Sequence, residues 1–205
     1  MMIAAIMCGG KGSRMGQLMN NEKPLLKLKG KALIEHVLDA LVESKKFRRI
    51  IGVSSSNTPK TSAFLHHCIA GQVNIIETEG ISYSKDLSMV LNKLEPARFF
   101  IVPADLPLLN AKIVGKIIHC LPDLPCISII IEKRFVEEIG IKPSVVFNAA
   151  GKECCYSGIL ILDSSKFKDG HSLEEYYIVM NEKEVAVNVN TKEELQLAER
   201  LLCSI

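Results

Sequence analysis

The stretch that decides the fold is IAAIMCGGKGSRMG, residues 3–16, in which a short aliphatic run ends abruptly in glycines. The run from Ile3 to Met7 is continuously apolar, which predicts a strand covered on both faces. Residues 8–16 then combine four glycines with a hydroxyl group and two cations. Glycines let backbone amides approach a phosphate closely, and cations reinforce such an anion site. We therefore expect polyphosphate to bind at Cys8, Gly9, Gly10, Lys11, Gly12, Ser13 and Arg14.

The spacing of this loop excludes two familiar phosphate-binding motifs. A Walker A sequence, G-x-x-x-x-G-K-[ST], cannot be laid on it, and the glycines run G-x-G-x-x-x-G instead of in the dinucleotide-binding order. The structural alternative is a tight turn between strand and helix that carries surface charges. Adjacent glycines, a hydroxyl and both cations favour the phosphate loop over that turn.

Short aliphatic runs like the first recur along the chain and alternate with segments of helical spacing. The expected strands cover residues 49–53, 73–76, 99–102 and 127–131, and the expected helices cover 32–44, 59–70, 82–94 and 110–120. Parallel strands need crossover helices between them. The alternation therefore predicts an α/β fold with a mostly parallel central sheet and helices on both of its faces.

The last third of the chain departs from this alternation. Residues 144–147 and 156–162 are β-rich runs separated by residues 148–152, which have the composition of a turn. They predict an antiparallel hairpin, so the central sheet should be mixed. Residues 185–189 predict one more strand.

A capping box marks the final helix. Thr191 and Glu194 have the spacing that caps a helix N-terminus, here of a helix from Lys192 to Cys203. No internal repeat and no linker-like stretch interrupts the sequence. We therefore expect residues 1–205 to form a single domain.

Composition bounds the classes of function. Of the 205 residues, 48% are hydrophobic and 23% charged, which excludes a disordered or low-complexity chain. The net charge of +2 makes nucleic acid and polybasic membrane contacts unexpected as partners. No apolar run approaches the roughly 18 residues of a membrane span. The seven scattered cysteines without a C-x-x-C pair suggest free thiols, so we expect a cytoplasmic protein.

Two further charged residues are candidates for the chemistry. Lys23 precedes Pro24, which fixes the backbone, and it could fold back over the glycine loop to meet a phosphoryl group in transit. The alternative is a solvated surface lysine. Asp105 follows the strand at 99–102, at the carboxyl end where ligands bind in such sheets. Because Mg²⁺ needs only one or two protein carboxylates, Asp105 suffices as a ligand; the alternative is a helix N-cap or turn aspartate.

These motifs resemble those of the nucleotidyltransferases with a nucleotide-sugar-pyrophosphorylase-like, GT-A-type fold. Residues 6–16 and the sequence EKPL at 22–25 look like their signature, with Cys8 where the family usually has Ala. Asp105 matches their metal-binding Asp. VNVNTKEEL at 187–195 is similar to their late segment, which supplies a second metal ligand at Asn190. The resemblance implies a Mg²⁺ cofactor held by Asp105 and Asn190.

Within that superfamily, the chain most resembles the archaeal GTP:adenosylcobinamide-phosphate guanylyltransferases, through residues 56–61, 142–144 and 157–159. The resemblance implies transfer of GMP from GTP to adenosylcobinamide phosphate in cobalamin biosynthesis, which releases pyrophosphate. The roles it implies are neutralisation of the leaving pyrophosphate, charge stabilisation at the α-phosphoryl group and metal binding. The implied catalytic residues are Lys11 and Arg14 for the pyrophosphate, Lys23 for the α-phosphoryl group and Asp105 for the metal.

The base and the acceptor should lie near other loops. We expect guanine recognition after the second and third strands, from Asn57, Thr58, Gly80 and Tyr83. Asn57-Thr58-Pro59 could equally be a helix N-cap with proline at the first position. Gly158 could leave room for the bulky acceptor, because a Cβ there would protrude; its alternative is a β-bulge glycine.

Two other functions stay open from the sequence. One is another nucleotidyltransferase, similar to molybdenum-cofactor guanylyltransferases or sugar-phosphate enzymes, which would share every phosphate and metal residue. The other is a GTP-binding sensor module without turnover. The sequence leaves the oligomeric state open, so a homo-oligomer is compatible with it.

Overall fold

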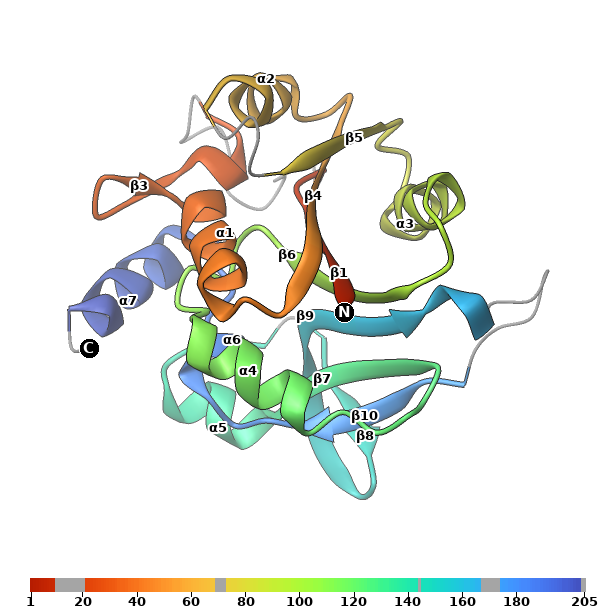
Figure 1. Ribbon diagram of the computed structural model, residues 1–205. Helices are drawn as coiled ribbons and strands as arrows, with labels where there is room; N and C mark the ends of the chain where they lie inside the picture. The colour runs from red at the N-terminus through yellow and green to blue at the C-terminus, as the bar shows by residue number, and fades with distance from the viewer. Residues whose placement is uncertain (10–20, 69–72, 144, 167–173, 204–205) are drawn as a thin grey trace.

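The computed structural model describes residues 1–9, 21–68, 73–143, 145–166 and 174–203 (Figure 1). Eight strands form one mixed sheet in the order β10-β7-β9-β6-β1-β4-β5, with β8 paired to β9. The strands are β1 Met2–Met7, β4 Phe47–Ser55, β5 Asn74–Thr78, β6 Arg98–Pro103, β7 Cys126–Glu132, β8 Phe147–Ala149, β9 Lys152–Asp163 and β10 Tyr176–Val179.

The direction of the strands decides where a site can form. The strands β6, β1, β4 and β5 are parallel, as are β7 and β10, and β9 runs antiparallel between β6 and β7. The prediction of a mostly parallel, mixed sheet is thereby confirmed. The carboxyl ends of β1, β4, β5 and β6 therefore meet at one edge of the sheet.

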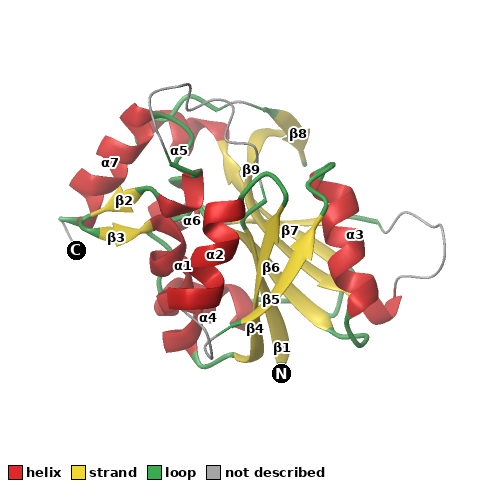
Figure 2. Cartoon of the chain, turned by 90° about the horizontal axis from the view of Figure 1, so that it is seen from above, coloured by secondary structure: helices red, strands yellow, loops and turns green. Residues whose placement is uncertain are grey.

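Helices cover both faces of the sheet, as expected, but unequally. In Figures 1 and 2, α1, α2 and α4 lie on one side of the strands and α3 lies on the other. The helices are α1 Leu33–Ser44, α2 Pro59–Cys68, α3 Tyr83–Lys93, α4 Ala111–His119, α5 Lys133–Glu138, α6 Lys183–Ala186 and α7 Lys192–Leu202. Within the described residues, none of them combines the length and hydrophobicity that a membrane crossing requires.

Short elements connect the first loop to α1. They are the 3₁₀ turn η2 Lys23–Leu25 and the small hairpin of β2 Lys27–Leu28 and β3 Lys31–Ala32. Pro24 occupies an early position of η2, where its missing N–H costs nothing. A second 3₁₀ turn, η3 Ser164–Lys166, follows β9.

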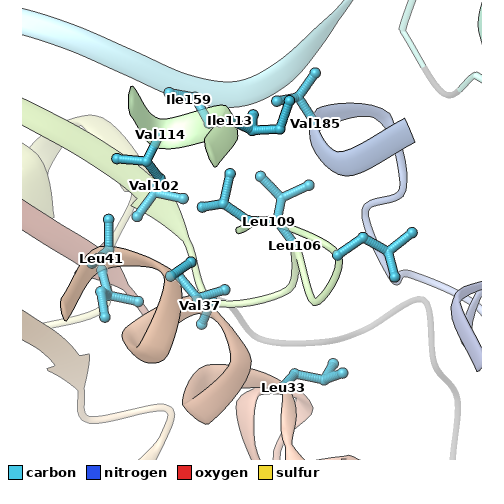
Figure 3. Close-up of a cluster of buried hydrophobic side chains, with 14 of the residues drawn as sticks. Leu33, Val37, Leu41, Val102, Leu106, Leu109, Ile113, Val114, Ile159 and Val185 are labelled. Carbon is cyan, nitrogen blue, oxygen red and sulfur yellow. The ribbon is translucent and has the colours of Figure 1, made fainter. Parts of the chain in front are cut away.

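The core on the α1 side anchors the loop that follows β6. Figure 3 shows Leu106 and Leu109 of that loop among Val37 and Leu41 of α1 and Val102 of β6. Leu106 is completely buried and Leu109 is 4% exposed. Burial of each such leucine is worth about 1.5–3 kcal/mol. The residues that flank Asp105 therefore fix its loop to the core.

The prediction of a strand at residues 185–189 is wrong. Residues 183–186 form α6, and residues 187–190 are irregular. Val185, Val187 and Val189 are completely buried. Their apolar run packs into the core without joining the sheet, and periodicity alone cannot distinguish these cases in so short a segment.

The expected hairpin in the last third is confirmed, with shifted boundaries. Its first strand is β8, Phe147–Ala149, instead of residues 144–147, and its second begins at Lys152 instead of 156. Ala150 and Gly151 have φ of +51° and +81°, so two residues suffice to turn the chain. The other expected strands and helices overlap observed elements, and the capping box of Thr191 and Glu194 is present at α7.

Candidate active site

Three polar side chains from distant parts of the chain meet at the carboxyl edge of the sheet. The Lys23 ammonium forms an ion pair with Asp105 Oδ2 and donates a hydrogen bond to Asn190 Oδ1 at 2.8 Å. The side chains of Lys23 and Asp105 are each 15% exposed. A pair this sheltered from water interacts more strongly than a surface salt bridge. Asp105 and Asn190 thus lie together, as the expected metal pair requires, and Lys23 lies between them.

Backbone hydrogen bonds set the position of Asp105. Ala104 N donates to Met7 O at 3.1 Å, which ties the loop to the end of β1. Val189 N donates to Asp105 O at 2.9 Å, which ties the segment before Asn190 to the same loop. Three separate segments are thereby held in register around Asp105.

The oxygen atoms of this cluster suit a hard divalent cation. Asp105 Oδ1 is buried and has no hydrogen-bond partner among the described residues. An unsatisfied buried acceptor costs about 1–3 kcal/mol, so a cation there would relieve a penalty already present. The Lys23 ammonium contacts Asp105 Oδ2 and Asn190 Oδ1 in this structure, so Mg²⁺ would bind there once the lysine turns toward substrate phosphate. One carboxylate and the amide oxygen of Asn190 then form a donor set that Mg²⁺ accepts when substrate phosphates and water complete its shell. The residues therefore fit Mg²⁺.

Cys8 begins the glycine loop and lies near Asp105. Its side chain is 2% exposed, and its backbone N donates to Val53 O at 2.8 Å. Burial raises the pKa of the Cys8 thiol, and the negative charge of Asp105 raises it further. A neutral thiol here fills the place of the small residue usual in related loops and is a poor nucleophile. The remaining predicted phosphate-loop residues lie outside the described part of the chain: Gly10, Lys11, Gly12, Ser13 and Arg14.

A second group of predicted residues meets beside the start of the same loop. Asn57 Nδ2 donates to Gly80 O at 2.8 Å, and Ser55 Oγ donates to Gly9 O at 3.0 Å. The ends of β1, β4 and β5 are thereby connected. Tyr83, the first residue of α3, is 52% exposed.

Thr58 differs from its neighbours in this group. It is 1% exposed, and its hydroxyl accepts from Ser55 N at 3.1 Å. The hydroxyl is therefore used within its own turn. Asn57 and Gly80 remain the better candidates for contact with a base.

Gly158 lies on β9 beside the loop that carries Asp105. Its φ is +87°, and a Cβ added there would lie 2.9 Å from Cγ of Pro103. The pairing of β7 with β9 shifts register between Ser128 and Ile130, opposite this glycine. The β-bulge alternative therefore has a structural basis, and the space that a Cβ would take is filled by Pro103 instead of standing open for an acceptor.

Comparison with known proteins agrees with this architecture. The MobA-like NTP transferase domain family matches residues 4–150. The adenosylcobinamide-phosphate guanylyltransferase of Methanocaldococcus jannaschii is 36% identical over 98% of this chain and 97% of its own. The chain belongs to this guanylyltransferase family.

Two further proteins are similar to this chain at lower identity. A probable molybdenum cofactor guanylyltransferase of Thermococcus sibiricus is 31% identical, over 58% of this chain and 55% of its own. A hypothetical transferase from Thermus thermophilus superposes with a TM-score of 0.73 at 17% identity, over 95% of this chain and 99% of its own. This structural likeness shows a shared fold.

The sequence analysis did not identify two residues that take part in this candidate active site. Ser55 connects the turn before α2 to Gly9, and Glu22 bonds to the start of α2. Ser55 could have been noticed as a hydroxyl at the end of a predicted strand. Glu22 belongs to the EKPL segment that resembles the family signature, but nothing in the sequence indicated its contact with α2.

Proposed function

We propose that the protein transfers GMP from GTP to adenosylcobinamide phosphate in a Mg²⁺-dependent reaction that gives adenosylcobinamide-GDP and pyrophosphate. The observation that carries the proposal is the convergence of Lys23, Asp105 and Asn190 at the carboxyl edge of the sheet. Membership of the adenosylcobinamide-phosphate guanylyltransferase family supports the choice of both substrates.

The reaction needs positioning and charge neutralisation more than covalent chemistry by the protein. An oxygen of the acceptor phosphate attacks the α-phosphorus of GTP, and the bond from that phosphorus to the β-phosphate bridging oxygen breaks. Lys23 would stabilise negative charge on the α-phosphoryl group, and Lys11 and Arg14 would neutralise the departing pyrophosphate. Asp105 and Asn190 would hold Mg²⁺, which neutralises phosphate charge when bound.

The two substrates would approach from different sides of Asp105. We assign guanine recognition to the group of Asn57, Gly80 and Tyr83, beside Gly9, with Thr58 supporting the turn. The acceptor would lie near Gly158, on the strand next to Pro103. A cytoplasmic location is supported by the buried free thiols Cys8, Cys126, Cys154 and Cys155, which fit a reducing compartment.

Pyrophosphate release tests this function directly. Each of the four common nucleoside triphosphates is paired with adenosylcobinamide phosphate, a sugar phosphate or molybdopterin. We expect turnover with GTP and adenosylcobinamide phosphate. Turnover with molybdopterin instead would indicate the other guanylyltransferase function, and GTP binding without release for any acceptor would indicate a sensor.

A variant of Asp105 tests the role of the site. Asp105→Asn should lower kcat by about 10²–10³-fold at saturating Mg²⁺, as expected for loss of a group that organises transition-state charge. The matched control is Asp39→Asn, which removes the carboxylate of a more exposed pair with Lys31. Equal kcat values for the two variants would refute the assignment of Asp105.

A further inference from the structure

The N-terminus of α2 is capped by a residue from a distant part of the chain. Lys60 N donates to Glu22 Oε1 at 2.8 Å, and Thr61 N donates to Glu22 Oε2 at 2.6 Å. Both oxygens of one carboxylate thus bind the first turn of α2, 38 and 39 residues further along the chain. Hydrogen bonds to an ionised acceptor are stronger than neutral ones, and the helix dipole favours a negative charge at this end.

The residue that should cap α2 locally is otherwise occupied. Thr58 lies directly before Pro59, the first residue of α2, where a hydroxyl would ordinarily accept from the first turn. Its hydroxyl accepts from Ser55 N at 3.1 Å instead. Glu22 therefore supplies the carboxylate that the first turn of α2 would otherwise lack.

Glu22 also controls the backbone that carries Lys23. Leu25 N donates to Glu22 O at 2.9 Å, which closes the η2 turn. Lys23 is the next residue and directs its ammonium to Asp105 and Asn190. The backbone of Glu22 is thus part of the turn that carries Lys23, while its carboxylate binds the first turn of α2.

The same end of α2 is part of the group assigned to the base. Asn57 and Thr58 immediately precede α2, and Ser55 and Asn57 contact Gly9 and Gly80. Among the described residues, Glu22 therefore connects the turn that carries Lys23 with the turn that lies beside Gly9.

We propose that Glu22 is a positioning residue that fixes Lys23 relative to the nucleotide by anchoring η2 to the N-terminus of α2. This inference rests on the proposed function for its kinetic consequence, but its structural part does not. Without the carboxylate, η2 loses these two hydrogen bonds to α2, and Lys23 is held less firmly beside Asp105.

Kinetics separate positioning from general stability. Glu22→Ala should lower kcat by about 10²-fold, because misplacing a catalytic group by about 1 Å can cost that much. The Kd for GTP should change by less than about 3-fold. Glu22→Ala should lower kcat much less when it is introduced into the Lys23→Arg variant than when it is introduced into the parent protein, because the two residues act as a unit. Glu22→Gln keeps one acceptor oxygen and should restore part of the loss.

Labelling of Lys23 tests the positioning without any activity. The protein is treated with an amine-acylating reagent, and modification of Lys23 is followed by peptide mass spectrometry. Because Lys23 is ion-paired and 15% exposed, it should react slowly in the parent and several-fold faster in Glu22→Ala. Glu35→Ala is the matched control, since Glu35 Oε2 accepts from Ala32 N at 2.6 Å and caps α1.

The outcomes distinguish the two proposals. Faster labelling in Glu22→Ala but not in Glu35→Ala supports the positioning role. If the parent then transfers GMP to no acceptor, the proposed function fails while the positioning role stands. Unchanged labelling in Glu22→Ala, or equally faster labelling in Glu35→Ala, overturns the inference. If Glu22→Ala does not fold, Glu22→Gln is compared with Glu35→Gln by the same measure.

Discussion

Replacement of Gly158 by alanine perturbs the strand beside Asp105 at one defined atom. The glycine has φ of +87°, and the new Cβ would lie 2.9 Å from Cγ and 3.3 Å from Cδ of Pro103. A proline ring cannot turn aside as a flexible side chain can, so β9 or the loop after β6 must shift. That loop continues directly into Asp105.

Two terms add in the free energy of unfolding. An L-residue in the left-handed region costs about 1–2 kcal/mol, and overpacking against Pro103 costs about 1–3 kcal/mol more. We therefore expect Gly158→Ala to lose about 2–5 kcal/mol. For a chain of 205 residues this corresponds to a fall in Tm of roughly 10 °C.

Urea unfolding of two glycine variants separates these terms. Gly151 has φ of +81° and nothing within 4 Å of its added Cβ, so Gly151→Ala carries the backbone cost alone. Gly158→Ala should therefore be less stable than Gly151→Ala by about the overpacking cost of 1–3 kcal/mol. Gly158→Ala should also lower turnover, because a shift of Pro103 displaces Asp105 in the same loop. Equal stability of the two variants would refute the reasoning from Pro103.

Three further predictions concern other parts of the molecule. Lys11→Ala should weaken GTP binding by about tenfold, the effect of one lost hydrogen bond to a charged group; calorimetry that gives the parent Kd would contradict the phosphate loop. Thr191→Ala should cost about 1 kcal/mol of stability in urea unfolding by removing the cap of α7, whereas Thr191→Ser retains the capping hydroxyl and should stay close to the parent. Burial lowers the pKa of His36 below its ordinary 6.5, so the unfolded chain binds that proton more readily. Stability should then fall as the pH drops below 6.5, and urea midpoints of His36→Gln should show a smaller loss.

The central part of the fold could be predicted from the sequence because local patterns and tertiary environment agree there. The apolar run at residues 3–7 is a strand buried on both faces, and the stripe of residues 32–44 covers one face of the sheet as α1. The run at 185–189 was misassigned because it is buried without strand partners. The short strand β10 has the β-rich sequence YYIV, but a continuous apolar run of four residues has no period that distinguishes a strand from a buried helical segment.

The candidate site could be predicted only in part. Asp105 follows a recognisable buried strand, so its position at the sheet edge could be predicted. The place of Asn190 beside Asp105 depends on an irregular segment held by Val189, for which the sequence has no periodic signal. The cap that Glu22 provides for α2 joins segments 38 residues apart, and it depends on the packing of η2 in three dimensions.

A crystal structure with GTP and Mn²⁺ in place of Mg²⁺ tests the central claim most directly, because the anomalous signal locates the metal. We predict one Mn²⁺ in contact with Asp105, Asn190 and a phosphate oxygen, with Lys23 directed to the α-phosphate. Bound GTP with Mn²⁺ that touches neither Asp105 nor Asn190 would contradict the account.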